Sequence, residues 1–299
     1  MISTLFSPSK YGLIRDIGGD EGISFGTGTL EMFTFLGVLI GTYLAALLSD
    51  HYHLWLFVAV LIGFSLMQLI SSRLLKQVQE TQTIVVENET LNPITFFIKS
   101  FRWARTIPGA NVILLGLAIF WMIGNFILMN LTIHCDKVLH MTNTKTGIMM
   151  DISGLGIGIG SILTGLLSKK KVQLGLTPIG ALGMLICFAL LYFLRPTGLF
   201  FTTLIFLVSF FCGMYMVPLS SWVQHSVEGR LQGDMLAYSN FIIFLLILIS
   251  AGIFGPFVKA FDTNLLWLLL LGIVFCMQVI LLVNVKEMRQ KFVGLFKKE

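Results

Sequence analysis

Long apolar runs are the feature that most constrains how this chain folds. Each run of about 20 residues, at about 1.5 Å of helical rise per residue, is long enough to cross a hydrocarbon core of about 30 Å. The apolar residues are continuous and do not alternate with polar ones as in barrel strands. The sequence therefore predicts an all-α integral membrane protein with eight transmembrane helices. The predicted spans are residues 29–49, 54–72, 111–133, 147–167, 175–194, 199–222, 235–257 and 264–284.

The composition supports the same class. Charged residues make up only 12% of the 299 residues, and hydrophobic residues make up 56%. A soluble domain carries about 25% charged residues. This chain has too few charges to cover a water-facing surface, so most of its surface is expected to face lipid.

Lys and Arg are distributed unevenly between the predicted loops. If the amino terminus is cytosolic, 16 of the 20 Lys and Arg fall in cytosolic segments, and only Lys137, Lys145, Arg195 and Lys259 fall outside. Membrane proteins carry such an excess on their cytosolic side. We therefore predict a multi-pass protein with both termini cytosolic. The net charge of +5 reflects this topology, and we expect no nucleic-acid partner.

The order of the spans divides the chain into three regions. Residues 1–72 hold a cytosolic loop and two helices, residues 73–110 form a cytosolic linker, and residues 111–299 hold six helices and a cytosolic tail. In secondary transporters of the major facilitator type, two six-helix halves flank a substrate site near the membrane midplane. The order predicts a partial major facilitator fold, made of the last two helices of the N-terminal half and the whole C-terminal half. Four helices of that fold are then expected upstream.

The linker contains an amphipathic stretch. Ile94, Phe97, Ile98 and Phe101 fall on one stripe at helical spacing, and Lys99 and Ser100 are expected to point away from it. Such a helix lies in the head-group plane on an anionic inner leaflet. We predict an interfacial helix here.

Several segments resemble one transporter family. FSPSKYGLI, at residues 6–14, resembles the SPxKYG loop of bacterial lysophospholipid transporters, including the transporter domain fused to acyl-carrier-protein synthetase/acyltransferases. Four further segments resemble that family and follow in its order: LEMFTFLGVLIGTYLAALL, LLGLAIFWMIGN, ISGLGIGIGSILTGLLSKKKVQLGLTPIGALG and GMYMVPLSSWVQ. Together they cover most of the chain.

The resemblance implies a function. Family members are taken to move lysophospholipids, notably lysophosphatidylethanolamine, to the inner leaflet for reacylation. It implies a location in the bacterial cytoplasmic (inner) membrane and alternating access between two helical halves. The implied partners are membrane lipids, the lysophospholipid substrate, and either a missing four-helix half or an acyltransferase. Two alternatives stay open: a non-transporting remnant or membrane scaffold for an acyltransferase, and a major facilitator carrier of another small solute.

The opening loop holds two candidate substrate residues. Lys10 can meet a head-group phosphate as a point charge, and Tyr11 can stand at the water interface. In the alternative interpretation, Pro8 and Gly12 only shape a turn, and Lys10 is a cytosolic anchor.

Ionisable residues inside spans are functional candidates, because a central charge costs about 2.5–3.5 kcal/mol on insertion scales. Glu31 and Asp151 are the two predicted cases. Each is expected in the first turns of its helix, where an acid suits the positive end of the helix dipole. Functionally, either can pair with an ethanolamine ammonium or carry a coupling proton.

Uncharged polar residues provide further candidates. Asn125 lies one helical turn from Trp121 and on the same face. Together with Asn130, Gln224 and Asn240 it offers hydrogen-bond partners for a head group. Hydrogen bonding between helices explains such residues equally well.

Small residues and a proline mark candidate packing or gating positions. Gly154, Gly156, Gly158 and Gly160 allow close approach between helices, either as fixed packing or as a sliding surface. Pro218 removes one backbone donor and predicts a kink, either structural or part of a gate. We expect nearby Ser hydroxyls to satisfy the carbonyl that Pro218 frees.

No pattern indicates catalysis. His134 and His225 do not start an HxxxxD acyltransferase motif, and the sequence has no P-loop and no nucleophile elbow. The cysteines form no CxxC pair. We therefore expect no enzyme activity, no cofactor and no metal. The cysteines are Cys135, Cys187, Cys212 and Cys276.

Overall fold

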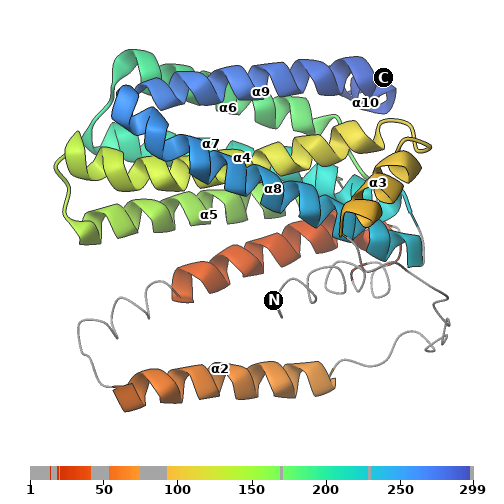
Figure 1. Ribbon diagram of the computed structural model, residues 1–299, viewed down its shortest axis with the longest axis horizontal. Coiled ribbons are helices and arrows are strands. Elements are labelled where there is room, and N and C mark those ends of the chain that lie inside the picture. The colour runs from red at the N-terminus through yellow and green to blue at the C-terminus, as the bar shows by residue number, and fades with distance from the viewer. Residues whose placement is uncertain are drawn as a thin grey trace.

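The computed structural model describes residues 14, 19, 21–41, 54–74, 93–168, 171–227 and 230–296. All regular structure in this part of the chain is helical (Figure 1). The first helix, Glu21–Gly41, is called the N-terminal helix below. The others are α2 (Leu54–Leu74), α3 (Pro93–Ala104), α4 (Ala110–Lys137), α5 (Asn143–Ser168), α6 (Leu176–Leu194), α7 (Gly198–His225), α8 (Arg230–Ala260), α9 (Leu265–Asn284) and α10 (Lys286–Phe296). The candidate residues Lys10 and Tyr11 lie outside the described residues.

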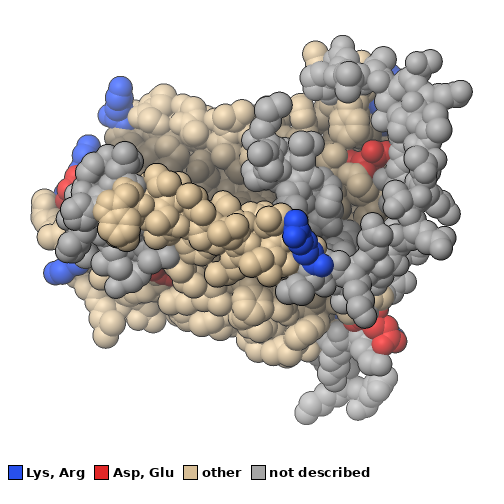
Figure 2. All heavy atoms as spheres, turned by 90° about the horizontal axis from the view of Figure 1, so that it is seen from below, with Lys and Arg blue, Asp and Glu red and all other residues tan. Residues whose placement is uncertain are grey.

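Eight of the described helices are long and apolar enough to cross a membrane: the N-terminal helix, α2, and α4 to α9. This confirms the predicted all-α membrane fold. Figure 2 shows one side of the molecule, where uncharged surface covers most of the described helices and charged side chains lie toward helix ends. Such a surface suits contact with lipid tails.

The start of the first span differs from the prediction. The N-terminal helix already includes Glu21, whereas the hydropathy pattern placed its start near residue 29. The segment GISFGTGT, residues 22–29, reads as a loop because glycine weakens an isolated helix. In the structure this segment is helical and packs against α5, with Gly28 against the backbone of Ser161 and Gly165. Tertiary packing therefore overrides the local propensity.

Helix α7 lies at the centre of the bundle formed by α4 to α9. It packs against α4, α5, α6 and α8, and α9 packs against α4 and α6. The largest side chains fully buried in this bundle include Trp267, Tyr215 and Phe188. Lipid tails are as apolar as these side chains, so the helices are held together mainly by close packing and interhelical hydrogen bonds.

The two helices before the linker behave differently. The N-terminal helix contacts α5 closely, whereas α2 lies apart from the bundle in Figure 1 and none of its membrane-spanning window is buried. Apolar side chains occur on every face of α2, and before Arg73 in its last turn the helix carries no charged residue. An all-round apolar helix suits a lipid environment.

The amphipathic helix of the linker is present as α3, but its faces differ from the prediction. Phe97 points to α8, with its ring centroid 5.5 Å from that of Tyr238 and 5.1 Å from that of Phe241. Ser100 is buried rather than turned outward, and Ile94 and Ile98 are exposed. The predicted stripe is therefore split between protein contact and an exposed apolar face. Its location in a membrane interface stays a prediction.

Helix α10 was not predicted, because its sequence is short and only weakly apolar. Met288 anchors it and is completely buried. Glu287 forms an ion pair with Lys291 at 2.7 Å and accepts a hydrogen bond from Trp222 Nε1 at 3.3 Å. Lys291 also donates from Nζ to the Val172 carbonyl at 2.6 Å. Helix α10 thus joins the end of α7 to the link between α5 and α6.

The described Lys and Arg separate between two ends of the bundle. The basic residues of α3 and α10 lie at one end (Figure 1). Lys137, Lys145, Arg195 and Lys259 lie at the other end, where α4 and α8 end and α5 and α7 begin. This separation is the basis of the predicted orientation. Which end faces the cytosol stays a prediction.

Candidate polar site between the N-terminal helix and the bundle

The glycines of α5 fall on two faces, and one face meets α7. A Cβ added at Gly156 would lie 2.6 Å from the carbonyl oxygen of Phe206, and one at Gly160 would overlap the backbone of α7. In return, a Cβ at Gly213 of α7 would lie 2.8 Å from the backbone nitrogen of Ser161. Small residues at such positions let two helix backbones touch. Helices α5 and α7 are therefore in direct backbone contact.

The other face of α5 meets the N-terminal helix. A Cβ at Gly165 would lie 3.0 Å from the carbonyl oxygen of Ser24 and 3.5 Å from the Cα of Gly28. At Gly154 and Gly158 an added Cβ would meet side-chain atoms of the N-terminal helix, with nearest distances of 3.0 and 3.7 Å. Helix α5 is thus packed between α7 and the N-terminal helix. On the second face there is little interlocking of side chains near Gly165.

A hydrogen bond joins α7 directly to the N-terminal helix beside this contact. Gln224 of α7 donates from Nε2 to Oγ1 of Thr27 at 3.0 Å and to the carbonyl of Ser220 at 3.2 Å. The side chains of Thr27 and Gln224 are both fully buried. Glu31, which is only 1% exposed, lies one helical turn beyond Thr27 on the same face of the N-terminal helix. We call Thr27, Glu31, Ser220 and Gln224 the polar interface cluster.

The position of Glu31 corrects one interpretation from the sequence. We expected Glu31 in the first turn of its helix, where the helix dipole favours an acid. Because the helix includes residues from Glu21 onward, Glu31 lies in its middle, beyond the reach of the dipole at the first turn. A carboxyl group buried inside a span is a candidate functional group, and that role of Glu31 stays a prediction.

The cluster keeps unused hydrogen-bonding capacity. The Oε1 atom of Gln224 and the hydroxyls of Ser24 and Ser161 are buried and have no hydrogen-bond partner among the described residues. Buried polar groups in proteins are nearly always paired. These atoms can therefore form further hydrogen bonds.

Pro218 lies inside α7, which continues to His225. The predicted role of the Ser hydroxyls is wrong. The Ser220 hydroxyl faces Gln224 Nε2 at 3.4 Å, and the Ser221 hydroxyl has no partner within the described part of the chain. The hydroxyl of Ser220 thus belongs to the polar interface cluster and does not donate to the carbonyl that Pro218 frees.

The remaining candidates lie on other helices. Asn125 donates from Nδ2 to Ser250 Oγ at 2.8 Å and so links α4 to α8. Trp121 is half-buried, with its ring edge-to-face on Phe120 at 5.4 Å. Asn130 is fully buried in α4, and its side-chain amide has no partner among the described residues. Asp151 and Asn240 are half-buried on α5 and α8, and Asp151 lies well inside α5 rather than in its first turns.

Thr27 was missed at the sequence level. A signal was present, because Ser24, Thr27 and Glu31 follow at spacings of three and four residues and so share one helical face. The pattern was hidden by the glycines between them, which moved the expected start of the helix beyond Thr27.

Comparison with known proteins places these helices in a family. Residues 1–251 match the family model described as Major Facilitator Superfamily. The match spans both helices before the linker and the bundle into α8, and so includes every residue of the polar interface cluster. No curated protein matches the sequence. With its eight candidate spans, this multi-pass membrane protein belongs to the Major Facilitator Superfamily, a family of membrane transporters.

Proposed function

We propose that this protein transports a lysophospholipid and binds the head group at the polar interface cluster. One observation carries the proposal: the buried carboxyl group of Glu31 lies in the middle of a span, one turn from the hydrogen bond between Thr27 and Gln224. Transporters of this superfamily bind substrates between two bodies of helices near the midplane. The polar interface cluster likewise lies between two bodies of helices, the N-terminal helix and the six-helix bundle, at the level of the last turn of α7.

The chemistry of the cluster suits a zwitterionic head group. The carboxylate of Glu31 complements an ethanolamine ammonium, while the free Oε1 of Gln224 accepts a hydrogen bond. The resemblance of FSPSKYGLI to the SPxKYG loop of lysophospholipid transporters supports the same substrate class, with Lys10 as the partner of the phosphate. The acyl chain stays in the surrounding lipid.

Movement between the two bodies is supported by the glycines of α5. Near Gly165 and Gly28 the backbones of α5 and the N-terminal helix touch without interlocking side chains. Such a contact resists sliding less than an interdigitated one. A small shift of the N-terminal helix along α5 would open the polar interface cluster to one side of the membrane and close it to the other.

Transport by the full chain in liposomes, with radiolabelled lysophosphatidylethanolamine, tests the proposal. Glu31→Gln removes the charge at nearly constant volume, and Thr27→Val removes the hydroxyl while Thr27→Ser keeps it. We expect the first two variants to lower the rate roughly tenfold, since one buried polar contact accounts for about that factor. Thr27→Ser and the lipid-facing control Cys276→Ser should retain the wild-type rate. Absence of lysophospholipid uptake, or equal rates for Glu31→Gln and wild type, would contradict the proposal.

The buried carboxyl group of Glu31 also favours a second candidate function, proton-coupled transport of another small solute. A protonated carboxyl group is neutral, so burying it inside the membrane costs far less free energy than burying an ion. This candidate predicts that a solute, added to proteoliposomes, drives proton uptake that Glu31→Gln abolishes. Lysophosphatidylethanolamine would then produce neither uptake nor a proton signal.

A further inference from the structure

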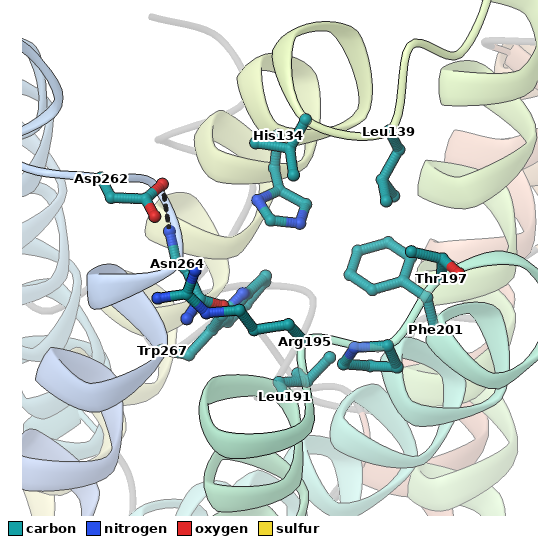
Figure 3. Close-up of a pocket in the computed structure, with 11 residues that line it drawn as sticks. His134, Leu139, Leu191, Arg195, Thr197, Phe201, Asp262, Asn264 and Trp267 are labelled. Atoms are coloured by element: carbon teal, nitrogen blue, oxygen red, sulfur yellow. Dashed lines mark hydrogen bonds between the residues drawn. The ribbon is translucent and has the colours of Figure 1, made fainter.

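A small pocket lies at the end of the bundle away from α3 and α10 (Figure 3). Four helix ends and the links between them meet there: α4 and α6 end, α7 and α9 begin. The pocket volume is about 60 Å³, which suits a small ionic group and not an acyl chain. The floor is apolar and includes Leu191, Phe201 and Trp267, and the polar lining includes His134, Arg195 and Asp262.

The imidazole of His134 is held in place by a short chain of hydrogen bonds. His134 Nδ1 lies 2.9 Å from Thr263 Oγ1, which in turn donates to Asp262 Oδ1 at 3.3 Å. Because the Thr263 proton is given to Asp262, Thr263 accepts a hydrogen bond from His134 Nδ1–H; this tautomer is assigned from the network. The ring is 5% exposed and stacks on Phe201, with centroids 5.5 Å apart.

The second ring nitrogen of His134 is available to a ligand. Nε2 makes no hydrogen bond within the described part of the chain. In Figure 3 the ring extends into the pocket between Asp262 and Phe201. When the ring is protonated, Nε2–H becomes a donor, and the negative charge of Asp262 stands behind the ring at the far end of the hydrogen-bond chain.

Arg195 lies at the rim in an unfavourable backbone conformation. It ends α6 with φ 44° and ψ 55°, in the left-handed region, which non-glycine residues rarely adopt. The following residue is Pro196, which disfavours helical conformations in the residue before it. Such strain is often found where a side chain must be held for a function. The guanidinium has no ion pair or hydrogen bond to the described residues, and Figure 3 shows the side chain extending across the pocket.

The amino-terminal end of α7 adds a third positive element. Thr197 precedes the first residue of α7 and lines the pocket, and its side chain makes no capping hydrogen bond. The first N–H groups of a helix lack partners within the helix and carry a partial positive charge, which makes this end suited to anions. The N–H donors of α7 therefore lie next to Arg195 and His134.

Asp262 does not compete for these donors. Its Oδ1 accepts hydrogen bonds from Thr263 Oγ1 and from the backbone N–H of Asn264 at 3.2 Å. The side-chain amide of Asn264 is also engaged, since Nδ2 donates to the Tyr192 carbonyl at 3.1 Å. The groups with unused donors are thus the guanidinium, the start of α7 and the protonated imidazole.

We propose that this pocket binds a phosphate oxyanion, held by Arg195, the first turn of α7 and protonated His134. Arginine and helix amino-terminal ends are common phosphate-binding groups. The phosphate belongs either to a lipid head group at the membrane surface or to a soluble phosphate. This site is separate from the polar interface cluster and does not depend on the proposed substrate.

Binding at this site depends on pH. The charged groups that face the imidazole are Asp262 from the α8–α9 link and Arg195 from the α6–α7 link; α7 and α9 contribute the neutral rings of Phe201 and Trp267. Protonation of His134 adds a donor for the oxyanion, so affinity falls as pH rises and the ring loses its proton.

The test uses the purified full chain in a phosphorus-free maltoside detergent, with binding measured by calorimetry. One arm adds inorganic phosphate, a second adds lysophosphatidylethanolamine, and a third adds monoacylglycerol, which has no phosphate. We expect saturable binding of at least one of the two phosphorus compounds, stronger at pH 6 than at pH 8, and no binding of monoacylglycerol at this site. The arm in which Arg195→Gln weakens binding identifies the source of the phosphate, because binding at the polar interface cluster does not depend on Arg195.

Two variants assign the binding to the pocket. Arg195→Gln should weaken it roughly tenfold, and His134→Gln should weaken it more at pH 6 than at pH 8. Lys259→Gln, which removes an exposed cation at the same end of the bundle, should leave it unchanged. Because Arg195 is exposed, its variant is expected to fold even if the His134 variant does not. Unchanged binding in Arg195→Gln, or no saturable binding of either phosphorus compound, would overturn the proposal.

Discussion

Gln224 of α7 donates a hydrogen bond to Thr27 across 3.0 Å, and the two residues lie 197 positions apart in the chain. This bond joins the N-terminal helix to the six-helix bundle inside an interface that is rich in glycine and also buries Glu31. Hydrogen bonds between membrane helices contribute about 0.6 kcal/mol on average and at most about 1.7 kcal/mol. A bond of this strength contributes to the docking of the helix and can break at modest cost.

Thr27→Val should lower the thermal stability of the purified protein by an amount in that range, about 0.5–1.5 kcal/mol, because Gln224 loses its partner across the interface. Thr27→Ser keeps a hydroxyl at the same position and should lie closer to wild type. Thermal unfolding in detergent measures both. If the Val variant were as stable as wild type, the bond would contribute nothing to docking of the N-terminal helix.

Gly160→Ala should destabilise the bundle by about 1–3 kcal/mol, as overpacking of a close contact does, because the added Cβ overlaps the backbone of α7. Gly124→Ala is the matched control, since an added Cβ there meets nothing within 4 Å. Alanine even favours a helix over glycine by up to about 1 kcal/mol. The two variants should thus shift the unfolding temperature in opposite directions, and equal shifts would refute the backbone contact between α5 and α7.

Helix α10 should depend more on Met288 than on its ion pair. Glu287 and Lys291 are partly exposed, so Glu287→Gln should cost under about 1 kcal/mol. Met288 is completely buried, and Met288→Ala should cost about 2 kcal/mol or more. Hydrogen exchange in residues 286–296 reports the detachment of α10. Faster exchange in the Glu287 variant than in the Met288 variant would reverse this order.

The predicted orientation can be tested at two exposed positions at opposite ends of the bundle. In a cysteine-free background, Thr142→Cys should react with a membrane-impermeant maleimide in intact cells. Gln290→Cys, in α10, should react only after permeabilisation. Both residues are exposed in the structure, so a difference in labelling reports the side of the membrane and not burial within the protein. The opposite pattern would invert the topology.

The sequence predicted the spans well because the hydrocarbon core of the bilayer sets both the length and the apolarity of a span, and both are local properties of the sequence. Helices α6 and α9 begin and end within about a residue of their predicted bounds. The start of the N-terminal helix was misplaced because Gly22, Gly26 and Gly28 disfavour an isolated helix. The contact of Gly28 with α5 depends on residues more than 130 positions away and is not visible in the local sequence.

The partners of polar residues were not predictable in the same way. Asn125 was a candidate for a head group, yet its amide bonds Ser250, which is 125 positions away. Gln224 was a candidate of the same kind, and its partner Thr27 is 197 positions away. A single sequence shows which residues can form hydrogen bonds, but the packing of helices distant in the chain decides which ones meet.

The central claim is that a lysophospholipid head group binds at the polar interface cluster. The most direct measurement is photo-crosslinking of the full chain with lysophosphatidylethanolamine that carries a photoreactive head group, followed by peptide mapping. The account predicts crosslinks in residues 24–31 and 220–224 that excess unlabelled lipid suppresses and that Glu31→Gln weakens. An apolar groove between α8 and α9, which includes Leu268 and Cys276, is the alternative place for the lipid. The account would be contradicted if the crosslinks that excess lipid suppresses were found only in that groove.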